Sequence, residues 1–76
     1  MEHMNININT EFIKLDQFLK WCGIAETGGV AHDLILQGEV TVNNDIETRR
    51  GKKLRAGDKV YVLGRTYIVT NTGESS

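Results

Sequence analysis

Residues 40–60, with the sequence VTVNNDIETRRGKKLRAGDKV, decide how this chain is expected to fold and act. The segment opens on alternating apolar residues, Val40 and Val42, and reaches polar turn residues at 43–45, which predicts a short strand followed by a turn. Positions 49–55 then hold five of the nine basic residues and no acidic residue, on a chain whose formal net charge is −1. A basic loop on a small folded scaffold is typical of a site for a polyanion.

The bulk properties of the chain restrict the class of protein. Its 76 residues are enough for one domain, and 39% hydrophobic with 25% charged residues is a globular composition. A single cysteine, Cys22, excludes an internal disulfide and a cysteine-rich zinc site. The sequence contains no apolar run of about 20 residues, as a membrane span requires, and no signal-peptide pattern at its start. We therefore predict a cytoplasmic protein with no membrane association.

Two helices are predicted before the basic segment. Between positions 14 and 22 the apolar residues recur at i, i+3, i+4 and i+7, which is the stripe of a short helix, and Gly23 is suited to end it. Thr27 can cap a second helix, whose apolar stripe is Val30, Ala31, Leu34 and Ile35 and whose end is Gly38. Because only residues 23–26 join them, the helices should pack as a helix-turn-helix-like pair.

The remaining pattern predicts short strands. Residues 5–9 alternate Asn and Ile, as in an edge strand, and residues 40–42, 59–63 and 67–69 alternate after the second helix. The expected fold class is therefore α+β, with the helix pair on one side of a small, bent, mainly antiparallel sheet. Residues 5–70 should form the single domain, with flexible tails at 1–4 and 71–76.

The residues between positions 12 and 63 resemble a known family. The matching positions are Lys14-Leu15-Asp16, Leu19, Gly23, Thr27, Ala31, Leu34-Ile35, Gly38, Val40, Val42-Asn43, Gly57-Asp58 and Val60. This pattern closely resembles the RNA-binding domain named after small-subunit ribosomal protein S-four, which is built on an alpha-L motif. Thr27-Gly28-Gly29 and Arg49-Arg50-Gly51-Lys52-Lys53 are most similar to the free-standing small type, represented by YaaA- and YbcJ-like proteins.

The resemblance implies a function and a set of partners. It implies binding to structured RNA, commonly ribosomal or transfer RNA, with no catalysis by the domain itself. We also expect a monomer without a cofactor, with ribosomal particles as a further partner. The family often has an arginine where Gly28 stands and a basic residue where His32 stands. Helix side chains should therefore contact fewer phosphates here than in many relatives, which increases the importance of the basic segment.

Eleven residues form the predicted RNA-binding site. They are Lys14, Lys20, Thr27, Gly28, Gly29, His32, Arg49, Arg50, Lys52, Lys53 and Arg55. Arginine offers a planar fork to a phosphate and lysine a flexible point charge. A helix N-terminus beginning at Thr27 would add backbone N–H groups, which two glycines would leave accessible. The less specific alternatives are a solvated loop neutralised by Asp45 and Glu47, a capped helix whose glycines pack on the sheet, and ordinary surface lysines.

Other residues favour no enzymatic site. Asp16 is expected to orient a basic side chain or to serve the helix start, and Trp21 to pack at the rim of the core or to stack on an RNA base. Cys22 should be a buried small hydrophobe, and His3 and His32 lack the spacing of metal ligands. The alternative function is a protein-interaction module whose basic segment docks an acidic partner.

Overall fold

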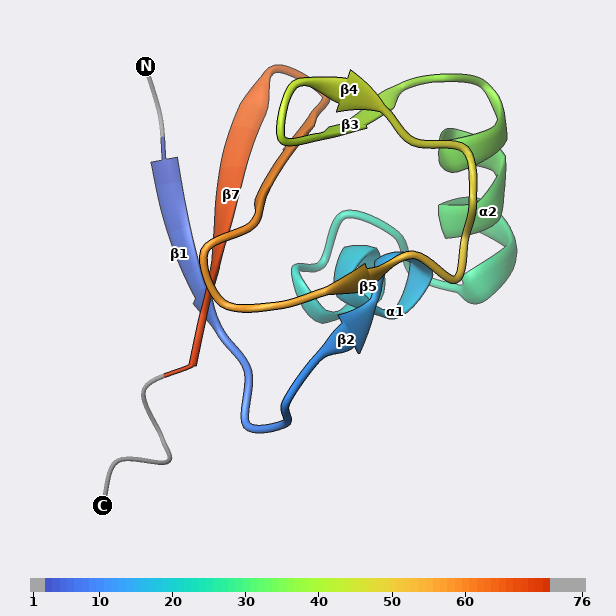
Figure 1. Cartoon of the computed structure of the whole chain (residues 1–76). Coiled ribbons are helices and arrows are strands. Elements are labelled where there is room, and N and C mark those ends of the chain that lie inside the picture. The colour runs from blue at the N-terminus through green and yellow to red at the C-terminus, as the bar shows by residue number, and fades with distance from the viewer. Residues whose placement is uncertain (1–2, 72–76) are drawn as a thin grey trace.

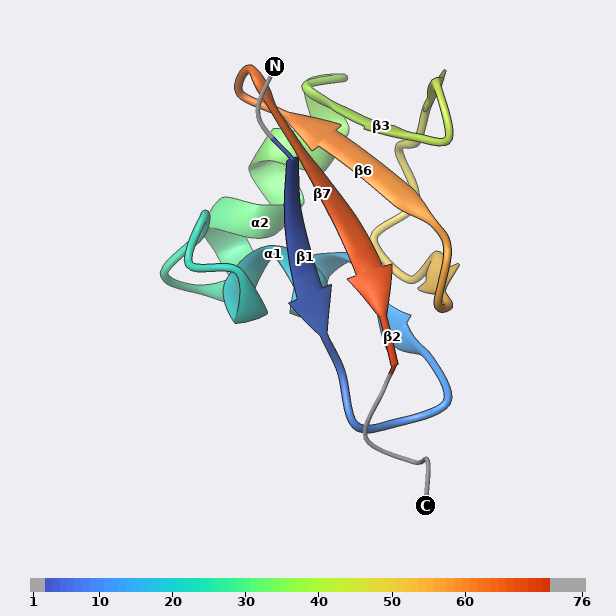
Figure 2. The same ribbon diagram turned by 90° about the vertical axis from the view of Figure 1, so that its left-hand side faces the viewer.

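Two helices lie against one face of a five-stranded sheet in the computed structural model, which describes residues 3–71 (Figures 1 and 2). In chain order the elements are β1 (His3–Asn7), β2 (Ile13–Lys14), α1 (Leu15–Trp21), α2 (Gly28–Leu36), β3 (Val40–Val42), β4 (Asp45–Ile46), β5 (Lys53–Leu54), β6 (Lys59–Val62) and β7 (Arg65–Thr70). The predicted α+β class, with a helix pair beside a small sheet, is confirmed.

The five-stranded sheet has the order β1-β7-β6-β3-β4. All its pairs are antiparallel except β1 with β7, so the sheet is mixed but mainly antiparallel. Strand β1 is an edge strand, as expected, but it begins at His3 rather than Asn5. Contrary to the expected flexible tail at 1–4, His3 and Met4 pair in register with Thr66 and Tyr67.

The ends of the chain are described only in part. Asn71, the first residue of the predicted C-terminal tail, donates a hydrogen bond from Nδ2 to the carbonyl oxygen of Thr10 at 2.7 Å. The rest of that predicted tail, 72–76, and residues 1–2 of the N-terminal one lie outside the described residues.

Two-residue turns connect the hairpins of the sheet. Asn43 and Asn44, between β3 and β4, have φ values of 53° and 76°, and Leu63 and Gly64, between β6 and β7, have values of 52° and 81°. Two successive positive φ values match the twist of the flanking strands, which is why such turns dominate short hairpins. Asparagine tolerates this conformation well, whereas Leu63 is an unusual residue there.

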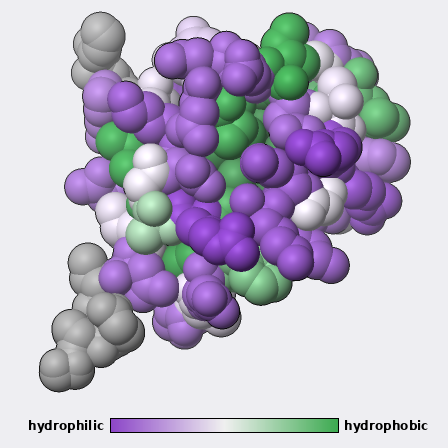
Figure 3. Space-filling view, viewed as in Figure 1, coloured by the Kyte–Doolittle hydropathy of each residue, from purple (hydrophilic) through white to green (hydrophobic). Residues whose placement is uncertain are grey.

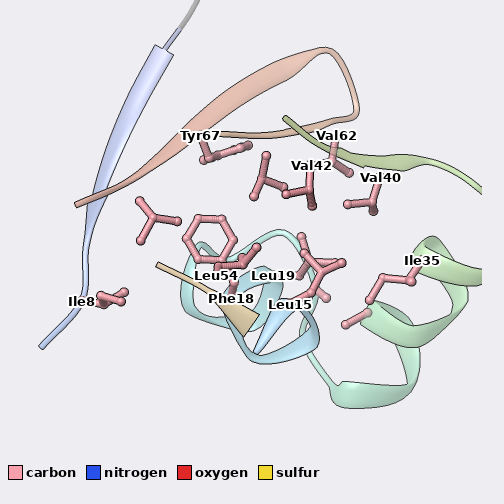
Figure 4. Close-up of a cluster of buried hydrophobic side chains, with 14 residues drawn as sticks. Ile8, Leu15, Phe18, Leu19, Ile35, Val40, Val42, Leu54, Val62 and Tyr67 are labelled. Carbon is pink, nitrogen blue, oxygen red and sulfur yellow. The ribbon is translucent and has the colours of Figure 1, made fainter. Parts of the chain in front are cut away.

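The core lies between the helices and the inner face of the sheet. Helix α1 buries Leu15, Phe18 and Leu19 completely, and Figure 4 shows these side chains facing those of Val42, Val62 and Tyr67 from the strands. Gly23 and Gly38 end the helices at φ values of 81° and 78°, as predicted. In α2, Ala31 and Ile35 are buried and Leu34 is half-buried.

Val30 departs from the predicted stripe of α2. Its side chain is 46% exposed. Figure 1 shows α2 at the side of the molecule. The helix therefore buries a narrower face than its apolar pattern suggests.

A second, two-stranded sheet pairs β2 with β5 and was not predicted. In this β2–β5 ribbon Ile13 lies opposite Leu54 and Lys14 opposite Lys53. Leu54 is fully buried and Ile13 packs on the core. Part of the segment expected to be a basic loop is therefore a strand. The sequence does not show this strand, because two residues are too few to show a period and the strand is defined by its distant partner.

Candidate nucleic-acid interface

The basic segment, residues 49–55, is fixed to the start of α1 by its backbone. The N–H groups of Leu15 and Asp16 donate to the carbonyl oxygens of Lys52 and Arg50 at 2.8 and 3.1 Å. The first N–H groups of a helix have no partner within the helix, so these bonds satisfy them. The basic segment turns at this point, and the Lys52 N–H donates to the Arg49 carbonyl oxygen at 3.2 Å to close the turn. The basic residues are thus presented from a defined backbone.

Arg50 is held by a carboxylate that is almost buried. Its Nε donates to Oδ2 of Asp16 at 3.2 Å, and Oδ1 of Asp16 accepts the N–H of Gln17 at 2.8 Å. Asp16 is 7% exposed. The carboxylate therefore orients a basic side chain, as predicted, and that side chain comes from 34 positions later in the chain. Nη1 of Arg50 also lies 3.4 Å from Nδ1 of His32, which joins the basic segment to α2.

Arg49 is also paired, with Glu47. Its Nε lies 2.9 Å from Oε2 of the carboxylate, which accepts the Arg49 backbone N–H as well at 3.1 Å. The side-chain hydrogen bond from Arg49 lowers the pKa of Glu47 below its ordinary value. Glu47 thus partly neutralises the basic segment, as the solvated-loop alternative supposed, through its pair with Arg49 and a weaker electrostatic interaction with Lys52.

The outer face of the β2–β5 ribbon carries the other cations. Lys14 lies directly across from Lys53. The Nζ of Lys53 and the guanidinium carbon of Arg55 lie 4.9 and 5.7 Å from the centroid of the Phe12 ring. We call Lys14, Lys53 and Arg55 the ribbon cations. Within residues 3–71, none of the three forms an ion pair with a carboxylate.

This arrangement has an electrostatic cost in the free protein. Like charges that face each other across two strands destabilise the pair. Phe12 offsets part of the cost, because the negative face of an aromatic ring attracts a cation. An anion placed over the ribbon would relieve the rest. Phe12 was not among the predicted site residues, although the matched patterns Phe-Ile-Lys at 12–14 and Lys-Leu-Arg at 53–55 could have indicated a ribbon with one polar and one apolar face.

The start of α2 has the predicted cap. Oγ1 of Thr27 accepts the N–H of Val30 at 3.2 Å. A Cβ added to Gly28 would meet nothing within 4 Å, and one added to Gly29 would meet only Oγ1 of Thr27, at 3.8 Å. The less specific alternative required the two glycines to pack on the sheet, and they do not. They leave the backbone of the first turn open to approach.

Lys20 and Lys52 complete the predicted set of residues. Lys20 is exposed in the last turn of α1, one turn after Asp16, and no hydrogen bond or ion pair within the described chain joins it to the basic segment. Lys52 is half-buried and contributes its carbonyl oxygen to α1. The structure thus brings the basic segment together with Lys14 and His32. No hydrogen bond or ion pair among residues 3–71 joins Lys20 to this group.

Trp21 and Cys22 occupy the end of α1. Trp21 is 57% exposed, and its Nε1 donates to the carbonyl oxygen of Asn7 at 3.1 Å, so it lies at the rim of the core. Cys22 is half-buried, and burial raises the pKa of its thiol to about 12. A thiol that stays protonated near neutral pH is a poor nucleophile. No group of three or more potential metal-ligating side chains occurs among residues 3–71.

Figure 3 shows mainly hydrophilic side chains on the face that carries β5 and the connection leading to it. The fold and this face define a small α+β module that presents clustered positive charge. A model of the S4 domain matches residues 6–70, and the chain belongs to this family. The family resemblance noted in the sequence is therefore confirmed.

Two relatives extend the comparison. The chain is 44% identical over 59 residues to the "Probable ribosome maturation protein RlbA" of Bacillus subtilis (strain 168). The aligned region covers 78% of this chain and 83% of that protein. The solution structure of YbcJ from E. coli matches with a TM-score of 0.64 and 30% identity, over 92% of this chain and 87% of that one. The YbcJ structure is described as revealing an alpha-L motif involved in RNA binding. No helix within residues 3–71 has the length and hydrophobicity needed to span a membrane.

Proposed function

We propose that this protein binds structured RNA, without catalysing a reaction, and that its RNA is a ribosomal RNA or transfer RNA helix. Membership of the S4 domain family, the RNA-binding motif named for YbcJ and the ribosome maturation role named for RlbA support this function. Ribosomal particles during their assembly are the corresponding partner.

The observation that carries the proposal is the outer face of the β2–β5 ribbon. It sets two lysines opposite each other, with an arginine nearby, and no carboxylate pairs with them among residues 3–71. Releasing condensed counterions from RNA phosphates is the main source of affinity for such a surface. The ribbon cations are available for phosphates at once, because no ion pair has to break first.

The arginine turn and the start of α2 would continue the same surface. Arg50 contacts His32 of α2, and Figure 1 shows the connection between β4 and β5 passing beside that helix. Arg49 and Arg50 would contact phosphates by exchanging or sharing their carboxylate partners. The Thr27-Gly28-Gly29 backbone would receive one further phosphate at the N-terminus of α2.

The proposal is tested by crosslinking the tagged protein to RNA in cells and sequencing the bound RNA. Wild type is compared with a Lys14→Ala/Lys53→Ala variant and with a Lys59→Ala/Arg65→Ala control. The control removes the same charge from exposed positions on β6 and β7. We expect enrichment of a defined ribosomal or transfer RNA helix, lost in the ribbon variant and retained in the control.

Binding to the enriched helix in vitro then measures the number of contacts. With three to five phosphates neutralised, the slope of log K against log salt concentration should be roughly −2 to −4. The ribbon variant should make the slope shallower by about 1 to 2. Equal loss of binding in both double variants would mean that overall charge, and not the ribbon, governs the interaction.

One observation favours the second candidate function, the docking of an acidic protein partner. Trp21 is a large aromatic side chain exposed beside an apolar groove, as at many protein interfaces. If the tagged protein retains a protein partner after nuclease treatment, and the ribbon variant loses that partner, the positive face is a protein-docking surface.

A further inference from the structure

A groove lies beside the ribbon, between α1 and the chain that connects β1 to β2. Its apolar walls include Ile8, Phe12, Ile13 and Trp21, and its polar walls include Lys14 and Gln17. Its volume is about 330 Å³, which falls in the range of about 300–1,000 Å³ found for small-ligand sites. Phe12 and Lys14 border both the groove and the ribbon.

Hydrogen bonds hold the walls of the groove in place. The Nε1 bond of Trp21 to the Asn7 carbonyl fixes the indole at one end. In the β1–β2 connection, Oγ1 of Thr10 donates to the carbonyl oxygen of Phe12 at 2.7 Å, and the Thr10 carbonyl accepts Nδ2 of Asn71. A groove whose walls are already ordered loses less conformational entropy when it is occupied.

The charge around the groove favours an occupant that carries a phosphate. No acidic residue lines it, and Lys14, one of its lining residues, lies opposite Lys53 in the β2–β5 ribbon. Glu11, in the same connection, is exposed and is not one of the lining residues. A molecule with an apolar flat part and an adjoining negative charge therefore matches the groove and the ribbon together.

We propose that the groove accepts one unpaired nucleotide of the RNA held on the ribbon. Its base stacks on the exposed indole of Trp21, and its phosphate lies between Lys14 and Lys53. The side-chain amide of Gln17 faces the base edge. Because unpaired bases splay out of RNA bulges and loops and are often stacked on aromatic side chains, this site selects a helix that carries such a defect over a continuous helix. The inference rests on the RNA-binding function proposed above.

The test uses three hairpin RNAs that differ at one position of the stem. One stem is fully paired, the second carries a single unpaired adenosine, and the third carries an abasic nucleotide there. Trp21 is the single tryptophan of the chain, so its fluorescence reports stacking directly. The adenosine RNA should quench the fluorescence and bind about 5- to 100-fold more tightly than the abasic RNA, as expected for stacking of one base.

Variants separate stacking from folding and from phosphate binding. Trp21→Ala should abolish the preference for adenosine over the abasic RNA, whereas Trp21→Phe, which keeps an aromatic ring without the Nε1 hydrogen bond, should keep a large part of it. Tyr61→Ala is the control, because Tyr61 is similarly exposed, at 50%, on β6. Tyr61→Ala should leave the preference unchanged. For the variants, binding is followed by the anisotropy of labelled RNA.

The outcomes distinguish this inference from the function on which it rests. If all three RNAs bind wild type equally, without quenching, while the ribbon variant binds none, the groove is not a nucleotide site and the RNA-binding function stands. If no RNA binds wild type even at low salt, both proposals fail. Quenching by an acidic peptide in place of RNA would overturn both in favour of protein docking.

Discussion

The two halves of the basic segment carry similar charge but differ in the partners of that charge. Arg49 and Arg50 each face a carboxylate, at 2.9 and 3.2 Å. The side chains of Lys53 and Arg55 face an aromatic ring, with Lys14 across the ribbon, and form no ion pair within residues 3–71; the Arg55 backbone N–H donates to the Asp58 carboxylate. A count of basic residues therefore overstates the charge that is free of a carboxylate in this structure.

The difference follows from what each half does for the fold. Arg50 pairs with a carboxylate that α1 and the basic segment nearly cover, so the pair joins two parts of the chain. A buried carboxylate without a partner is costly, and Arg50 prevents that cost. The ribbon cations lie on an outer face, where the opposite side of the ribbon supplies the packing through Leu54. The ribbon cations can therefore bind an anionic ligand without disturbing the packing of the core.

The largest effect that separates the two halves should be on stability. Arg50→Ala leaves the Asp16 carboxylate nearly buried without its charged partner, so it should lower the free energy of unfolding by about 1–2 kcal/mol, a figure that allows for the half-exposed guanidinium. Lys53→Ala removes a ribbon cation and should change the free energy of unfolding by less than about 0.5 kcal/mol. Urea unfolding followed by circular dichroism measures both.

A double-mutant cycle identifies the cause of the Arg50 effect. Adding Asp16→Asn to Arg50→Ala removes the unpaired charge and should recover part of the loss. If Arg50→Ala and Lys53→Ala have the same effect on stability, the structural distinction between the two halves is wrong.

The sequence predicts the helices and the presence of a basic site better than it predicts how that site is divided. The apolar spacing from Leu15 to Cys22, with Gly23 after it, is a local pattern, and local patterns specify helix ends. The Arg50–Asp16 pair joins residues 34 positions apart, and the β2–β5 ribbon joins strands about as distant. The local patterns indicate a basic partner for Asp16 and a polar and an apolar face at 12–14 and 53–55, but they do not say which distant residues meet. The identity of the partners, Arg50 for Asp16 and Lys53 for Lys14, therefore required the folded chain.

A smaller effect concerns Arg49 and Glu47. Glu47→Gln removes the charge that holds Arg49, so we expect RNA affinity to rise about two- to fivefold, as for the gain of one free surface charge. Titration of labelled RNA at fixed salt measures the change. Asp45→Asn is the matched control, because Asp45 is an exposed carboxylate on β4 with no basic partner among the described residues. An equal rise in the control would attribute the effect to net charge.

The Arg49–Glu47 pair also has a defined pH dependence. Because Arg49 lowers the pKa of Glu47 in the folded chain, the pair stabilises the fold above the pKa that Glu47 has in the unfolded chain. That contribution is lost as the pH falls through the lower, folded-state pKa. Glu47→Gln should remove this part of the acid dependence of stability, so the free energy of unfolding of the variant should lie slightly below that of wild type at neutral pH and approach it at low pH. The difference should be small, because the Arg49 side chain is exposed.

The smallest effect tests how far RNA extends from the ribbon past the arginine turn to α2. Gly28→Ala/Gly29→Ala adds side-chain atoms where neither glycine has a close neighbour other than the Thr27 hydroxyl, so stability should stay equal or rise by up to about 1 kcal/mol. The same methyl groups would stand between a phosphate and the first N–H groups of α2. We therefore expect RNA affinity to fall about two- to tenfold while stability does not fall, a combination that a purely structural role cannot produce.

Gly51→Ala is the matched control for that substitution. Gly51 lies in the arginine turn, where an added Cβ meets nothing within 4 Å and φ is not positive. If RNA passes from the ribbon over the turn to α2, Gly51→Ala should weaken binding as well. If only the α2 variant weakens binding, the phosphate track bypasses the turn, and the paired arginines are structural residues in the bound state as they are in the free one. If neither changes affinity, the ribbon and its groove are the whole interface.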